Sequence, residues 1–244
     1  MTNILVLPGV ASVPTDRSWM PALTILAVGA AIAAVAPFDR AFDALTIGSP
    51  IARVTALVAV VLAGFVFAAK VGARVESHDL RHPLITPLAI AAAVAVGITT
   101  LDAWVFRPIL APGYVAFVSE TDLTHRLAYF MLRAFNESIL YRLFLSSVLV
   151  WAIGRFWRRP DGLPANGAFW LGMVAAQVVN IAINVTFLDG FATTPALLVH
   201  DALRYVTPGV VWGFLYFRYG FVTHEIAAVG THLFFQPLLS VAFP

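Results

Sequence analysis

Residues 51–69 read IARVTALVAVVLAGFVFAA, and Lys70 follows them directly. About 20 predominantly apolar helical residues cross a bilayer, so this stretch has the length and composition of a transmembrane helix. The rest of the chain is similar: 60% of its 244 residues are hydrophobic and 11% are charged. A soluble domain has about 25% charged residues. The sequence therefore predicts an integral membrane protein in contact with lipid.

Apolar stretches of this kind recur along the chain. We expect seven of them to cross the membrane as helices, at residues 19–36, 51–69, 83–101, 125–156, 167–188, 194–219 and 222–243. Pro208 lies within the sixth stretch, and a break there would make eight elements. Charges, prolines and a glycine in residues 102–124 indicate an exposed loop or interfacial segment. The predicted fold class is an all-α bundle, with residues 1–244 as a single integral membrane domain.

The basic residues predict an orientation. They gather after the second and fourth expected spans and at the end of the sixth, and they are Lys70, Arg74, Arg81, Arg155, Arg158, Arg159 and Arg218. With seven spans, these three places share one face, which the positive-inside rule assigns to the cytoplasm. The connection at residues 189–193 has no lysine or arginine and falls on the other face. We expect a protein of the bacterial inner membrane with its N-terminus in the cytoplasm.

The composition also limits the possible functions. A net charge of +2 without a basic block argues against a nucleic-acid partner. The absence of cysteine excludes disulfides, thiol catalysis and iron–sulfur clusters. Zinc is weakly supported, because a catalytic zinc needs about three ligands and Glu137, His200 and His232 would have to converge. We expect no cofactor, and we expect membrane lipid as a partner.

Ionisable side chains inside an apolar helix are costly, so each one is a candidate functional residue. In the fourth expected span, Arg133 and Glu137 are four residues apart and share a helix face. Ser138 and Arg142 have the same spacing on a neighbouring face. A structural interpretation is that Arg133 and Glu137 neutralise each other and hold helices together. The functional interpretation is that Glu137 is a catalytic base.

The last expected span carries a polar stripe of Glu225, His232 and Gln236. Glu225 lies near the end of the helix, and we expect it to be interfacial. His232 lies near mid-membrane, either as a packing residue or as part of a site. The fifth span carries amides on one face, which either hold helices together or take part in catalysis; they are Gln177, Asn180 and Asn184. The sixth span carries a cluster one turn long, His200, Asp201 and Arg204, which either lines a pocket or pairs internally near the membrane surface.

A carboxylate, an imidazole and amides that meet inside a bundle are the groups needed to activate water. Glu137 would take a proton from the water molecule, and His232 would orient that molecule. Asn180 would be an amide donor that stabilises the oxyanion, and Gln236 would be another.

These residues resemble the motifs of the CPBP family of intramembrane proteases (CAAX-protease and bacteriocin-processing, or Abi) over residues 125–243. Glu137-Ser-Ile-Leu-Tyr-Arg142 is similar to the family's Glu-Glu-x-x-x-Arg, with Ser138 in place of the second glutamate. His232-Leu-Phe-Phe-Gln236 is similar to His-x-x-x-Asn, with glutamine for asparagine. The best register for the family's Phe-x-x-x-His places Ala176 and Asn180 at the two named positions.

The resemblance implies an intramembrane endopeptidase that hydrolyses a hydrophobic or membrane-tethered peptide. By this resemblance Glu137 is the base, His232 assists it, and Gln236 helps to hold the oxyanion. Arg142 is implied as a structural anchor, with Ser138 beside it. The main alternative is a catalytically inactive relative that binds a membrane partner through the same cavity. A small transporter or proton-coupled channel is a weaker alternative, because the sequence has no evident inverted repeat.

Overall fold

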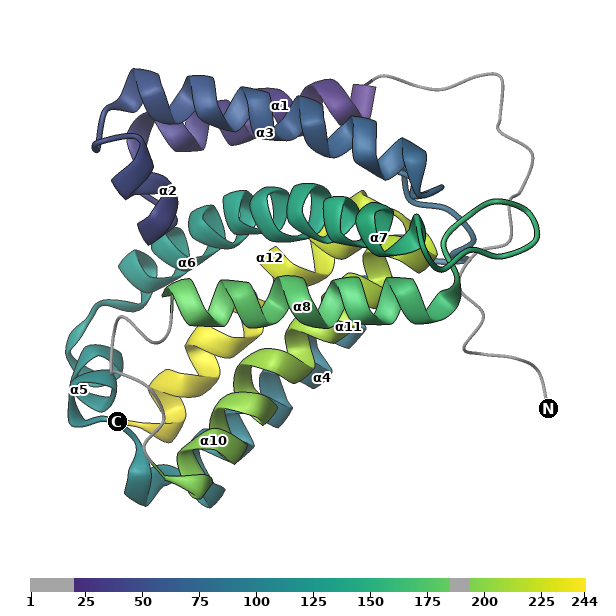
Figure 1. The fold of residues 1–244 in the computed structure, drawn as a ribbon. Helices are drawn as coiled ribbons and strands as arrows, with labels where there is room; N and C mark the ends of the chain where they lie inside the picture. Colours follow the sequence, from purple (N-terminus) through teal and green to yellow (C-terminus); the bar gives the residue numbers. More distant parts are fainter. Residues whose placement is uncertain (1–19, 185–193) are drawn as a thin grey trace.

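The computed structural model describes residues 20–184 and 194–244. This part of the chain is helical and has no strand beyond one isolated bridge between Arg158 and Pro164. The first elements, in chain order, are α1 (Met20–Val35), α2 (Arg40–Leu45), α3 (Pro50–Lys70), α4 (Ile85–Thr100), η1 (Leu101–Val105), η2 (Arg107–Ile109) and α5 (Pro112–Glu120). The others are α6 (Leu123–Ser138), η3 (Ile139–Ser146), α7 (Ser147–Gly154), α8 (Asn166–Asn184), α10 (Pro195–Asp201), η4 (Ala202–Val206), α11 (Thr207–Tyr219) and α12 (Phe221–Ala242). The expected all-α bundle is confirmed (Figure 1).

Five helices in the described part are long and apolar enough to cross a membrane. They are Pro50–Lys70, Ile85–Val105, Leu123–Gly154, Asn166–Asn184 and Phe221–Ala242. These correspond to five of the seven expected spans, so the count of seven is not confirmed. The first expected span forms α1, whose 16 residues are short for a crossing. The sixth forms α10, η4 and α11 and carries Asp201 and Arg204 within it. The expected connection at residues 189–193 lies outside the described residues.

Pro208 does not divide the sixth segment into two separate helices. α10, η4 and α11 follow one another without a gap, and η4 is a π-helical stretch directly before the proline. Proline has no N–H to donate and its ring crowds the preceding turn, so a widened turn accommodates it. The Thr207 side chain also donates to the Ala202 carbonyl at 3.2 Å. The alternative of eight elements is therefore wrong for this part of the chain.

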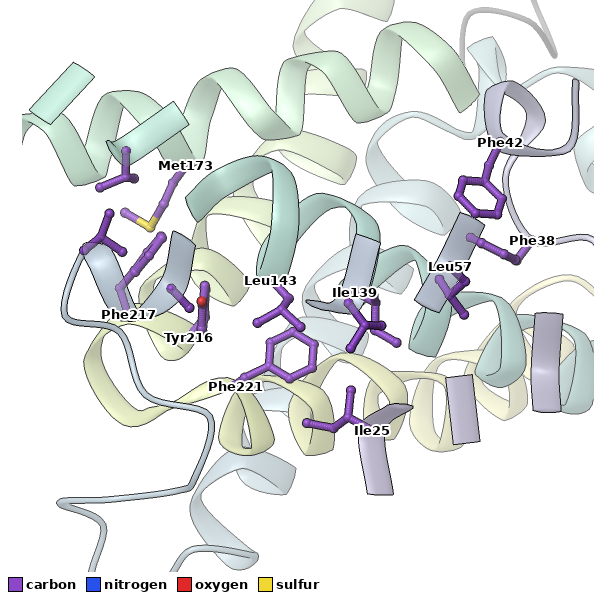
Figure 2. Packing of buried hydrophobic residues seen from close by; sticks show 14 of the residues in the cluster. Ile25, Phe38, Phe42, Leu57, Ile139, Leu143, Met173, Tyr216, Phe217 and Phe221 are labelled. Atoms are coloured by element: carbon purple, nitrogen blue, oxygen red, sulfur yellow. The ribbon is translucent and has the colours of Figure 1, made fainter. Parts of the chain in front are cut away.

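The long helix formed by α6, η3 and α7 lies at the centre of the bundle. It packs against α3, α8 and α12, while α1 lies against α3 and α6 (Figure 1). Leu143 and Ile139 of η3 are fully buried and belong to the main apolar cluster, together with Ile25, Leu57 and Phe221 (Figure 2). This packing fixes the direction in which the polar face of the central helix points.

Residues 102–124 do not form an exposed loop, which was one of the two expected alternatives, and the interfacial segment stays a prediction. η1 extends α4 by one π-helical turn, and η2 and α5 follow it. Asp102 is fully buried, although its charge suggested an exposed position. The reason is a set of partners on other helices, described below, which the local sequence does not reveal.

The basic connections meet at one end of the bundle. Residues 71–84 join the turn between α11 and α12 through backbone bonds, such as the Phe221 N–H to the Arg74 carbonyl at 3.0 Å. Gly220 makes this turn with φ of 99°, and a side chain there would overlap the Glu76 carbonyl. Lys70 and Arg155 both lie over the Trp151 ring, at 5.2 and 5.3 Å. The basic ends of α3 and α7 are thus neighbours.

Candidate active site

A cavity of about 950 Å³ lies inside the bundle, between α4, α5, α6, α8, α10–α11 and α12. It follows α12 from His224 to Leu239, which is about 22 Å at 1.5 Å per residue. All the site residues expected from the sequence line it: Arg133, Glu137, Ser138, Arg142, Asn180, His232 and Gln236. The structure therefore brings these residues around one space.

Glu137 is held by its neighbour one turn earlier on α6. Arg133 Nε lies 2.5 Å from Glu137 Oε1, and both side chains are 21% exposed. The same guanidinium contacts the Tyr129 hydroxyl and Asn184 Oδ1, each at 3.3 Å. The ion pair of the structural interpretation is thus present, but it lies on the cavity wall. Glu137 can act as a base only through the oxygen that Arg133 does not bind.

His232 approaches the cavity from α12. Its ring stacks on Phe130 with centroids 5.4 Å apart and an angle of 13° between the planes. Gln236 Nε2 lies 3.4 Å from His232 Nδ1, and because an amide nitrogen only donates, Nδ1 is the acceptor in this contact. The Nε2 atom is then the protonated nitrogen of the neutral ring. No hydrogen bond joins His232 to Glu137 within the part of the chain that the structure describes.

Arg142 connects the central helix to α8. Arg142 is 4% exposed, and its Nη2 donates to Gln177 Oε1. Gln177 Nε2 in turn donates to the Tyr205 carbonyl at 2.9 Å, which fixes the orientation of the amide. Gly209 makes room for this amide, because a Cβ at residue 209 would overlap the Gln177 side chain. Ser138 is also buried and lines the cavity.

Asn180 belongs to a second group of polar side chains. Its Oδ1 accepts from Asn184 Nδ2 at 2.9 Å. Asn184 also binds Asp39 and Tyr141, so it is the hub of this group. The sequence left Asn184 between a helix contact and a catalytic role, and Asp39 was not among the residues expected at the site.

A third polar cluster lies at the α5 end of the cavity. Asp102 Oδ2 accepts from Arg204 Nη1 at 2.6 Å and from the Tyr114 hydroxyl at 3.1 Å. His200 lies between two carboxylates, with Nε2 3.2 Å from Asp102 and Nδ1 3.0 Å from Asp201. Burial raises the pKa of Tyr114, so its hydroxyl stays protonated and donates. His200, Asp201 and Arg204 all line the cavity. His200 and Asp201 pair with each other, whereas Arg204 pairs with Asp102 outside this set.

Glu225, which we expect to be interfacial, is buried among the helices. It is 8% exposed, and the neighbouring His224, which the sequence analysis missed, is 1% exposed and lines the cavity. His224 Nε2 lies 3.8 Å from Glu225 Oε2. The signal for His224 was its spacing of eight residues before His232, which places both on one face of α12.

The structure describes no group of three or more acidic, histidine or cysteine side chains arranged to hold a metal ion in residues 20–184 and 194–244. The three zinc ligands considered from the sequence line the same cavity, but both ring nitrogens of His200 face aspartates. No protein family, curated protein or solved structure matches the chain.

Proposed function

We propose that the protein is an intramembrane endopeptidase of the CPBP type, which hydrolyses a membrane-associated peptide with water activated by Glu137. One observation carries the proposal: Glu137 from α6 and His232 from α12 line one cavity inside a bundle of apolar helices. A cavity of about 950 Å³ has room for a short extended peptide segment beside these groups. The amides of Asn180 and Gln236 line the same space.

The proposed reaction is an ordinary water-mediated hydrolysis. Glu137 Oε2 accepts a proton from a water molecule while Arg133 holds Oε1, and the water oxygen bonds to the substrate carbonyl carbon. The amide groups of Asn180 and Gln236 donate to the resulting oxyanion, and His232 orients the water. The carbon–nitrogen bond then breaks, and the protonated Glu137 returns its proton to the leaving amine.

A second candidate is a catalytically inactive relative that binds a hydrophobic membrane partner in this cavity. The Arg133–Glu137 ion pair at 2.5 Å favours this alternative, because it gives the carboxylate a structural partner. Asn180 also favours it, since an amide cannot carry a proton as the histidine of the family motif can. The two candidates differ in whether Glu137 takes part in a bond-breaking step.

Cleavage of membrane-tethered reporter peptides by the purified protein separates these candidates. We expect Glu137→Gln and His232→Gln to lower kcat by about 10²- to 10⁴-fold while the protein stays folded. Glu120→Gln and His82→Gln are matched controls at exposed positions and should leave the rate unchanged. Equal turnover by the wild type and Glu137→Gln would exclude the catalytic role. Binding of the peptide without cleavage by any variant would favour the inactive relative.

We further propose that α1 and the α10–α11 segment also cross the membrane, which makes seven spans with the N-terminus in the cytoplasm of a bacterial cell. Support comes from the basic residues Lys70 and Arg155, which meet at one end of the bundle. The chain has no cysteine, so single introduced cysteines can be labelled without background. An impermeant maleimide should label Ser119→Cys in intact cells and Arg158→Cys only after lysis. The reverse pattern would refute the orientation.

A further inference from the structure

Asp39 lies between α1 and α2 and is 2% exposed. Its Oδ1 atom accepts from the Phe42 backbone N–H at 2.8 Å and thereby caps α2. This cap uses only one carboxylate oxygen. The second oxygen, Oδ2, takes no part in the cap and is free to bind other side chains.

Oδ2 joins two segments that are distant in the sequence. It accepts from the Tyr141 hydroxyl at 2.6 Å and from Asn184 Nδ2 at 2.7 Å. Asn184 Nδ2 also lies 3.1 Å from the Tyr141 oxygen, so the three side chains form a closed triangle. Tyr141 stands one turn after Glu137 on the central helix. The carboxylate of Asp39 thus reaches the helix that carries the candidate base.

The chemistry of these groups gives the network one direction. A carboxylate only accepts, so Asp39 requires the Asn184 amide to turn its NH₂ group toward it. The amide oxygen then faces the other way, where it accepts from Arg133 Nη2 at 3.3 Å. Arg133 Nε donates to Glu137 Oε1 at 2.5 Å. Four side chains from three segments therefore form a chain of bonds that ends on Glu137.

We infer that Asp39 is a positioning residue of the candidate active site, because its carboxylate orients Asn184 and through it the Arg133 guanidinium that holds Glu137. The inference rests on the proposed function for its catalytic meaning, but the orientation of Glu137 can be measured without activity. Asp39 does not line the cavity and does not touch the reacting groups. Its effect is transmitted by hydrogen bonds.

Asp39→Asn is the most informative substitution, because asparagine caps a helix as well as aspartate does. The variant preserves the cap but introduces a second donor into the network. With its oxygen at the cap, its NH₂ group faces the NH₂ group of Asn184 and disfavours the orientation in which the Asn184 oxygen accepts from Arg133. Asp43→Asn is the matched control, because Asp43 lies in α2, the helix that Asp39 caps, and the substitution removes the same charge.

The measurement is the infrared carboxylate band of Glu137 in protein labelled with ¹³C-glutamate. The chain has four glutamates, and the band that disappears in Glu137→Gln identifies the one of interest. We expect this band to shift in Asp39→Asn and to stay in place in Asp43→Asn. Asn184→Ser removes the amide that links Asp39 to Arg133 and leaves the cap of α2 intact. It should therefore give the same shift, and it replaces Asp39→Asn as the test if that variant folds poorly. An unchanged band in both Asp39→Asn and Asn184→Ser, or a shift in Asp43→Asn, overturns the inference.

Kinetics with the reporter peptide give the second readout. We expect Asp39→Asn to lower kcat about 10- to 100-fold with KM within about twofold, as misplacement of a catalytic group does. Asp43→Asn should have the wild-type kcat. If the wild type cleaves no reporter while the Glu137 band still shifts in Asp39→Asn, the proposed function fails and the positioning role stands. A wild-type kcat in Asp39→Asn contradicts the positioning role in catalysis.

Discussion

Replacing Asp102 by asparagine should destabilise the protein far more than the same change at Asp79. Both carboxylates bind an arginine, Asp102 to Arg204 at 2.6 Å and Asp79 to Arg218 at 3.0 Å. They differ in burial, since the Asp102 side chain is fully buried and that of Asp79 is 59% exposed. The pair of substitutions therefore isolates the effect of burial on one kind of interaction.

The expected magnitudes follow from the environments. Removing one partner of a buried ion pair leaves an uncompensated charge and costs about 3–5 kcal/mol. An exposed ion pair contributes about 1 kcal/mol or less, because water solvates both partners when they separate. Asp102 also accepts from His200 and the Tyr114 hydroxyl, which lose their acceptor in part. The two variants should differ by at least about 2 kcal/mol, or about 30-fold in the unfolding equilibrium constant.

Equilibrium unfolding in mixed micelles with increasing SDS measures this difference, with the six tryptophans as fluorescence probes. A double variant, Asp102→Leu with Arg204→Met, should be more stable than the sum of its single variants predicts, because it removes both charges together. Similar unfolding free energies for Asp102→Asn and Asp79→Asn would refute the buried cluster. Additive effects of Asp102→Leu and Arg204→Met would show that the two residues are not paired.

Three further substitutions or conditions test other parts of the structure in the same unfolding assay. Gly209→Ala should destabilise the protein by about 1–3 kcal/mol through overpacking against Gln177, whereas a neutral effect would mean that α8 and α11 are farther apart. Tyr216→Phe should cost about 1–3 kcal/mol because it leaves the buried Ser147 hydroxyl without its partner at 2.9 Å, and a gain in stability would contradict that contact. Burial lowers the pKa of His78 below 6.5, so its contribution to stability is present above pH 6.5 and is lost as pH falls through the lower folded value. His78→Gln should reduce the loss of stability between pH 7 and 5, and an unchanged pH dependence would argue against burial of this ring.

The fold class could be predicted from the sequence because lipid imposes a local rule. An apolar stretch of sufficient length must form a helix in a bilayer, since every backbone group needs an internal partner. Residues 51–69 therefore led directly to α3. α1 and the α10–α11 segment were harder, because one is short and the other carries Asp201 and Arg204, so length and hydropathy do not decide whether they span.

The candidate site was partly predictable for a related reason. A charged or amide side chain in an apolar helix is costly unless it faces the bundle interior, so Glu137, Arg142 and His232 could be expected on a shared inner surface. Asp39 and Asp102 could not, because each lies at the end of an apolar stretch, where a charge ordinarily meets water. Nothing in their neighbouring residues distinguishes a buried aspartate from an exposed one.

The amino-acid sequence by itself determined that this chain is a helical membrane protein and which of its helices carry polar faces, since both follow from the local cost of placing groups in lipid. Only the tertiary structure decided which partner each polar group has. Asp102 binds His200 98 positions away, and Asp39 binds Asn184 145 positions away. Such pairs depend on how distant helices pack, and an isolated helix contains no information about the residue that will face it.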